Sequence, residues 1–133
     1  MTNFYPAEIK LWGFTFCHLE QCYQYFKCKF HKQWNSAERI LQCKDPKACY
    51  YIGKSCRTSK LWQTEKSHVM LHILKQKYMQ CKEFRQELQA NSDCVFIEDT
   101  GNRFWGRQGG QGANTLGVLL HRTLLECQDL GDE

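Results

Sequence analysis

Residues 9–31, IKLWGFTFCHLEQCYQYFKCKFH, contain the change of pattern that decides the fold. The first half alternates in part between apolar and polar residues and has Gly13 at its middle, which predicts a short strand or hairpin arm that bends there. From His18 to about His31 the apolar residues recur every three or four positions, which predicts a helix. The apolar stripe of this helix consists of Leu19, Cys22, Tyr23, Phe26 and Phe30.

Most of the chain beyond this stretch also has helical signals. Asn35 or Ser36 is predicted to cap a short helix that ends at Gln42, and Asp45 to cap one that begins at Pro46 and runs to about Gly53. Further helices are predicted over residues 64–78, with Thr64 as the cap, and over 81–90 and 114–126. Residues 93–98 are a second strand candidate, and 99–113 form a polar, glycine-rich loop. The predicted fold is therefore mainly α with a few short strands, or α+β by strict count.

Length and composition predict a single domain over residues 1–133. The chain is 42% hydrophobic and has only 2 Pro and 9 Gly, with no repeat or low-complexity block, which excludes disordered and fibrous classes. No apolar run approaches the roughly 20 residues that a membrane span needs, and the N-terminus does not resemble a secretory signal. We therefore expect an intracellular protein, cytoplasmic or nuclear, in which residues 127–133 form an acidic tail and a candidate disordered segment.

The nine cysteines are predicted to be free thiols. Their number is odd, the chain has no export signal, and no Cys-x-x-Cys pair occurs. We therefore expect buried cysteines that act as small hydrophobic residues, and no metal site.

Positive charge is concentrated in the middle of the chain. The net charge is +4, but the segment from Lys27 to Lys66 contains 10 Lys or Arg against 3 acids. A solvated surface is the ordinary explanation of such an excess. The functional alternative is a phosphate-bearing ligand or a nucleic acid.

Two places in the helices combine residue types that carry chemistry. Glu20, Gln24 and Lys27 lie in one row of the first helix, which is ordinary for a solvated face, but the helix dipole keeps a carboxylate in this first turn ionised. Trp62 precedes the predicted helix that contains Lys66. Such a tryptophan is usually a lid over the core, and the alternative is a flat surface for a planar heterocycle beside an ammonium group.

The third place is the segment from Trp105 to Gly117. Its glycines allow a ligand to approach the backbone closely, and a helix that starts near Asn114 would offer free N–H groups to an anion. Glu98 and Asp99 stand just before it, between a predicted strand and a loop. A carboxylate, an aromatic plate and an anion site can act on one small ligand only if they converge. We therefore expect Glu20, Trp62 and the Trp105 loop to line one cleft.

An ordered series of motifs runs through nearly the whole chain. It comprises Asn3-Phe4, Glu20-x-x-Tyr23-Gln24-x-x-Lys27, Gly53-Lys54, Trp62-x-x-x-Lys66-x-x-Val69-Met70, Lys77-Tyr78, Trp105-Gly106 and Gly112-x-Asn114-x-Leu116-Gly117. In this series the chain resembles the NADAR or YbiA-like N-glycosidases. The resemblance implies a single-domain helical fold of the YbiA-like type and cleavage of a bond between ribose C1 and nitrogen. The chain departs from the family pattern at its start, because many members carry an extra N-terminal strand before a Ser-Asn-Phe, which here reads Thr2-Asn3-Phe4.

The resemblance also implies roles for individual residues. The family's glutamate falls on Glu20, for stabilising the ribosyl cation and activating water. Its loop acid falls on Asp99, with Glu98 as the alternative, because the usual position near Trp-Gly holds no carboxylate here. The implied substrate-binding residues are Trp62, Trp105, Lys54, Lys66, Gln24, Gly106, Gly112, Asn114 and Gly117. No metal and no cofactor is implied.

The substrate is left open between two classes that members of this family act on. The basic middle segment favours removal of ADP-ribose from modified guanine in nucleic acid, with single-stranded DNA or RNA as a partner. The alternative is hydrolysis of ribosylaminopyrimidine phosphates of riboflavin biosynthesis. A non-catalytic module that binds ADP-ribose or nucleic acid, and a purely structural role for the Trp and Gly motifs, are the remaining hypotheses.

Overall fold

A β-hairpin opens the part of the chain that the structure, a computed structural model, describes: residues 6–91, 104–105 and 114–131. Strands β1 (Pro6–Leu11) and β2 (Phe14–His18) are antiparallel, and Ile9 pairs with Phe16 in the core. Trp12 and Gly13 form a two-residue turn with φ of 53° and 81°. Turns with two positive φ angles fit the twist of a hairpin and favour glycine. The predicted bend at Gly13 is confirmed.

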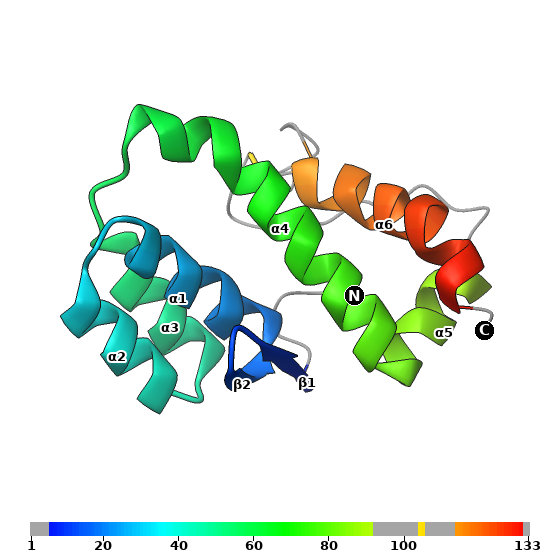
Figure 1. The fold of residues 1–133 in the computed structure, drawn as a ribbon, viewed down its shortest axis with the longest axis horizontal. Coiled ribbons are helices and arrows are strands. Elements are labelled where there is room, and N and C mark those ends of the chain that lie inside the picture. Colours follow the sequence, from blue (N-terminus) through cyan, green and yellow to red (C-terminus); the bar gives the residue numbers. More distant parts are fainter. Residues whose placement is uncertain (1–5, 92–103, 106–113, 132–133) are drawn as a thin grey trace.

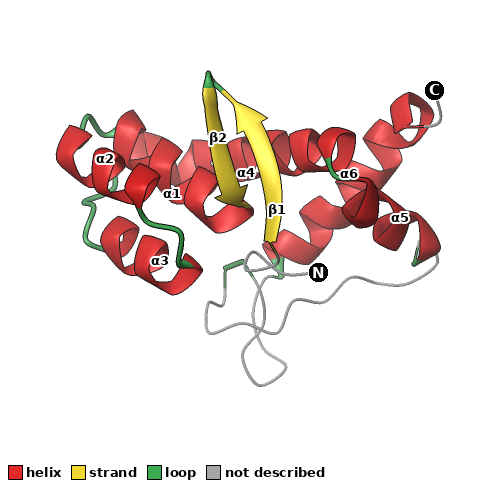
Figure 2. Ribbon diagram, turned by 90° about the horizontal axis from the view of Figure 1, so that it is seen from below, coloured by secondary structure: helices red, strands yellow, loops and turns green. Residues whose placement is uncertain are grey.

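Six helices follow the hairpin in the described residues. They are α1 (Leu19–Phe30), α2 (Trp34–Gln42), α3 (Pro46–Lys54), α4 (Lys60–Gln80), α5 (Lys82–Ala90) and α6 (Thr115–Gly131). Helix α1 contacts α2, α3, α4 and the hairpin, and α4 contacts α5 and α6. Figure 1 shows the long α4 lying between the group α1–α3 and the pair α5 and α6. Figure 2 shows the hairpin crossing between these two groups. The predicted mainly α fold is confirmed.

The helix boundaries agree with the sequence patterns except at three termini. Asp45 accepts a hydrogen bond from the Ala48 amide, as its predicted role as N-cap requires. Thr64 is wrong as a cap because α4 begins one turn earlier, where the Ser59 hydroxyl accepts from the Trp62 amide. Helix α2 begins at Trp34, before the predicted caps, and α6 continues to Gly131, into the predicted acidic tail. The predicted strand 93–98 lies outside the described residues.

Helix α1 is buried on nearly every side because it lies between four other elements. Its buried polar residues therefore make specific bonds. His18 caps the helix by accepting from the Gln21 amide, and its other ring nitrogen donates to the Lys44 carbonyl. Burial lowers the pKa of His18, which favours this neutral ring. The Gln21 side chain donates to the carbonyls of Ile40 and Cys43, so that it joins α1 to the end of α2.

The eight cysteines that the structure describes are free thiols, as predicted. Five of them are buried, namely Cys22, Cys28, Cys49, Cys56 and Cys127. Burial raises the pKa of Cys28 to about 11 and that of Cys49 to about 12, as expected for thiols that serve as small hydrophobic residues. Among the described residues, no helix is both long enough and apolar enough to cross a bilayer.

Candidate active site

The row of polar residues on α1 is buried at its start. Glu20 and Gln24 are each 4% exposed, whereas Lys27 is half-buried. The ordinary interpretation of this row as a solvated face is therefore wrong for its first two members. The Gln24 Nε2 group donates to Glu20 Oε1 at 2.9 Å. An amide that donates to a carboxylate favours its ionised form, so Gln24 offsets part of the cost of burying a charge at Glu20.

Tyr23 links Glu20 to both tryptophans of the predicted site. Its ring centroid lies 5.7 Å from that of Trp62 and 5.4 Å from that of Trp105. The Trp62 indole N–H lies close to the Tyr23 hydroxyl and favours its ionised form, which opposes part of the effect of burial. Burial and the nearby charge of Glu20 raise the pKa of Tyr23, which keeps its phenol protonated. The structure thus brings Glu20, Trp62 and Trp105 together around Tyr23, which the sequence patterns placed in the apolar stripe of the helix but not among the site residues.

Trp62 lies within the aromatic core rather than on an open surface. It is 1% exposed, and its ring packs against Phe26, Phe30 and His31 as well as Tyr23. This position corresponds to the interpretation of Trp62 as part of the core. Trp105 is half-buried and meets Tyr23 edge-on. Trp105 is therefore the tryptophan with surface available to a heterocycle.

The Lys66 ammonium lies beside an aromatic ring and within electrostatic range of Lys27. Lys66 donates to Gln63 Oε1, and its Nζ atom is 3.7 Å from the ring centroid of Phe104. Burial and the neighbouring charge of Lys27 lower the pKa of Lys66. Two like charges that interact repel each other, and an anion bound near them would relieve the repulsion. Lys27, which the sequence patterns placed in the row with Glu20 but gave no binding role, therefore joins Lys66 as a candidate phosphate-binding residue.

The start of α6 is already in use by the chain itself. The Thr115 amide donates to the Phe104 carbonyl at 2.9 Å, and the Leu116 amide donates to the Trp105 carbonyl at 2.7 Å. These two N–H groups are not available to an anion, which corrects the prediction of a free helix start there. Their bonds instead hold the segment of Phe104 and Trp105 against α6. Asn114 is buried with a φ of 52°, and Gly117 is buried within α6.

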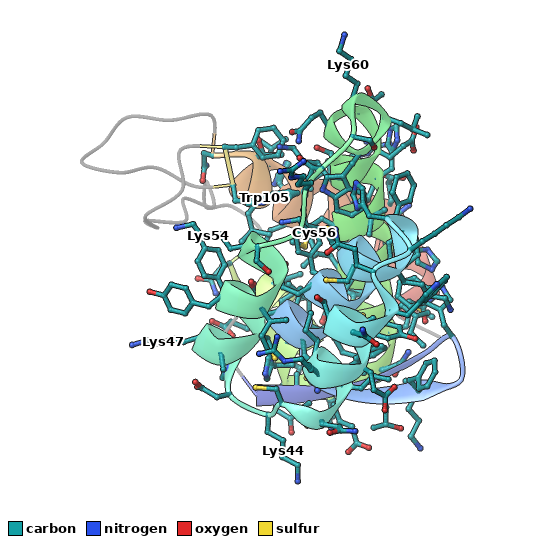
Figure 3. The ribbon with its side chains drawn as sticks, turned by 90° about the vertical axis from the view of Figure 1, so that its left-hand side faces the viewer. Lys44, Lys47, Lys54, Cys56, Lys60 and Trp105 are labelled. Atoms are coloured by element: carbon teal, nitrogen blue, oxygen red, sulfur yellow. The ribbon has the colours of Figure 1, made fainter. Side chains whose placement is uncertain are left out.

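The remaining predicted site residues fall into two groups. Lys54 is exposed at the end of α3, with its Nζ atom 5.9 Å from the ring centroid of Tyr50. Figure 3 shows it extending into solvent. The predicted acids Asp99 and Glu98 and the glycines Gly106 and Gly112 lie outside the described residues. Within residues 6–91, 104–105 and 114–131 no group of three or more His, Cys, Asp or Glu side chains is arranged to hold a metal ion.

The chain belongs to the NADAR domain family, whose pattern matches residues 1–125. It is 32% identical to N-glycosidase YbiA of Escherichia coli over 123 residues, which cover 90% of this chain and 75% of the relative. It is 26% identical to riboflavin biosynthesis protein VVA0006 of Vibrio vulnificus over 97% of this chain, but over only 35% of that longer protein. Its fold is similar to the NMR structure of Escherichia coli YbiA, with a TM-score of 0.79 and 30% identity over 97% of this chain and 79% of that one.

Proposed function

We propose that this chain hydrolyses the bond between ribose C1 and nitrogen in an N-glycoside. The observation that carries the proposal is the buried Glu20 carboxylate, which accepts from Gln24 and interacts with Tyr23, whose ring contacts both Trp62 and Trp105. The name of the YbiA relatives, N-glycosidase, supports the same reaction class. A binding module would not need a buried carboxylate at this point, since a charge costs free energy to bury.

The reaction requires stabilisation of positive charge and transfer of protons, and these residues can supply both. Breaking the glycosidic bond develops positive charge on the ribose ring, and the Glu20 carboxylate stabilises that charge and accepts a proton from the attacking water. Water adds to C1 while the leaving nitrogen takes a proton. Asp99, or Glu98 beside it, is the proposed second acid for that proton or for the ribose hydroxyls, as the family resemblance implies. Trp105 and Tyr23 bound the heterocycle, and Lys27 and Lys66 bind phosphate.

The proposed substrate is ADP-ribose attached to guanine in nucleic acid. Two ammonium groups within electrostatic range of each other suit a diphosphate better than a single phosphate, because each can meet a different phosphate. The second candidate is a ribosylaminopyrimidine phosphate, which the name of the Vibrio relative favours. Both substrates are broken at the same bond.

A comparison of the two substrates tests this assignment. The protein is incubated with ADP-ribosylated single-stranded DNA and, separately, with ribosylaminopyrimidine phosphate, and the released sugar phosphate is measured by mass spectrometry. We expect free ADP-ribose from the first and a much slower release of ribose phosphate from the second. The opposite order would assign the protein to the pathway intermediate, and no release from either would remove the hydrolase proposal.

A basic and aromatic surface on α3 supports the proposal that the substrate is a polynucleotide. Lys47 and Lys54 are exposed and lie about two helical turns apart, and Tyr51 between them is 66% exposed. Figure 3 shows both lysines pointing away from α3, with Lys44 and Lys60 also extending into solvent. Exposed aromatic rings among cations are typical of surfaces that stack bases and contact the backbone of a single strand.

Binding to ADP-ribosylated single-stranded DNA is expected to weaken steeply with salt. Each neutralised phosphate releases counterions, so that about three contacts give a slope of about 2 in log affinity against log salt. Replacing Lys44 and Lys47 with alanine should lower this slope by about 1 and leave turnover of a short ADP-ribosyl nucleoside unchanged. Fluorescence anisotropy over a salt series measures the slope, with the exposed Lys82→Ala on α5 as the control. An affinity of the unaltered protein that does not change with salt would show that the excess charge is an ordinary solvated surface.

A further inference from the structure

Gly53, in the last turn of α3, lies where a side chain would collide with Gln24. A Cβ atom built on Gly53 would be 1.8 Å from Gln24 Oε1 and 2.5 Å from Gln24 Cδ. Atoms that are not bonded to each other do not approach this closely, so one of the two must move. Gly53 lies inside a regular helix and has no left-handed φ. The glycine is therefore required here for space and not for backbone conformation.

The Gln24 side chain fills this space, and the two polar atoms of its amide differ in their hydrogen bonding. Its Nε2 group donates to Glu20, whereas its Oε1 atom is buried and has no hydrogen-bond partner in the described part of the chain. A buried acceptor without a partner costs free energy. Turning the amide over would place Oε1 against the Glu20 carboxylate, and two acceptors facing each other would repel. In this orientation Gln24 donates to Glu20 while its oxygen lies against the bare Cα of Gly53.

We propose that Gly53 is a positioning residue for Glu20, acting through the Gln24 amide. The proposal rests on the proposed hydrolysis only for its effect on turnover. A larger residue at position 53 displaces the amide, and Glu20 then loses the hydrogen bond that Gln24 donates to it. A buried carboxylate that loses a donor is harder to ionise, so less Glu20 is available as a carboxylate at neutral pH.

Two titratable groups that interact electrostatically with Glu20 are Tyr23 on the same helix and Cys49 on α3. Burial raises the pKa of both groups, so that neither carries a charge at neutral pH. Neither of them can therefore produce a change in the acidic part of a pH profile after substitution of Gly53.

A double-mutant cycle tests the proposal. Gly53→Ala, Gln24→Ala and the double variant are compared with the unaltered protein by kcat/KM for an ADP-ribosyl guanosine between pH 4 and 8, which is about the range in which a shifted carboxyl titrates. We expect each single change to lower kcat/KM at neutral pH at least about tenfold and to move the acidic limb to higher pH. In the double variant we expect no loss beyond that of Gln24→Ala, because the collision then has no partner. Ser55→Ala, an exposed change one residue past the end of α3, is the control.

A measurement that does not depend on turnover distinguishes a failure of this proposal from a failure of the proposed function. The Glu20 carboxyl carbon is titrated by NMR in each variant, and we expect its pKa to rise in Gly53→Ala whether or not the protein cleaves the probe. If Gly53→Ala alone does not fold, the double variant is compared with Gln24→Ala. Equal kcat/KM and carboxyl pKa in those two support the proposal. A further loss from Gly53→Ala in the absence of the Gln24 side chain, or an unchanged carboxyl pKa in a folded Gly53→Ala, would overturn it.

Discussion

Replacing Glu20 with glutamine is expected to lower turnover by roughly 10³-fold while the protein still binds its ligand, because the loss removes a group that acts on charge and a proton in the transition state. Glutamine has nearly the same shape and still fits beside Tyr23. It has no negative charge to stabilise a ribosyl cation and cannot accept a proton from water. Turnover is measured with ADP-ribosylated single-stranded DNA, and binding is measured with ADP-ribose by calorimetry.

The same experiment separates the enzyme from a binding module. Glu8→Gln, which removes an exposed carboxylate from β1, is the matched control and should have no effect on turnover. Unchanged turnover in Glu20→Gln would remove Glu20 from the mechanism. Binding without turnover in the unaltered protein would instead favour the module that holds ADP-ribose but does not cleave it.

Replacing Trp62 with alanine should destabilise the protein by about 3–5 kcal/mol, the usual cost of deleting a large buried aromatic side chain. The ring is in contact with aromatic residues of α1 and with His31. Alanine leaves a cavity there. Urea unfolding measures the change in the free energy of unfolding.

Two further variants serve as controls for Trp62→Ala. Trp34 is 57% exposed at the start of α2, so Trp34→Ala should change stability by no more than about 0.5 kcal/mol. Trp62→Phe retains most of the core contacts, and ligand binding should survive in it if Trp62 acts as part of the core. A loss of binding in a stably folded Trp62→Phe would show that the indole contacts the ligand. A Trp62→Ala protein as stable as the unaltered one would contradict the packing described here.

The positions of Glu20 and Gln24 on one helix follow from the local sequence, but the burial of these two residues does not. Spacing alone places Glu20 and Gln24 on adjacent turns of one helix, within reach of a hydrogen bond. Periodicity predicts only one apolar face for that helix, and it therefore predicts that these two residues are solvated. The structure surrounds α1 with the hairpin and three helices, so its polar face is buried as well. Burial by elements distant in sequence has no local signal.

Sequence by itself determined the local features of this protein. The hairpin at Gly13, the helix that follows it, the Asp45-Pro46 cap and the mainly helical class all depend on neighbours within a few residues, and local propensity and periodicity report those neighbours directly. The tertiary structure alone decided three others: Trp62 in the core, the amides of α6 bonded to the Phe104 and Trp105 carbonyls, and Gly53 against Gln24. Each of these joins segments 10 or more residues apart, and such contacts are set by how whole helices pack, which no short pattern encodes.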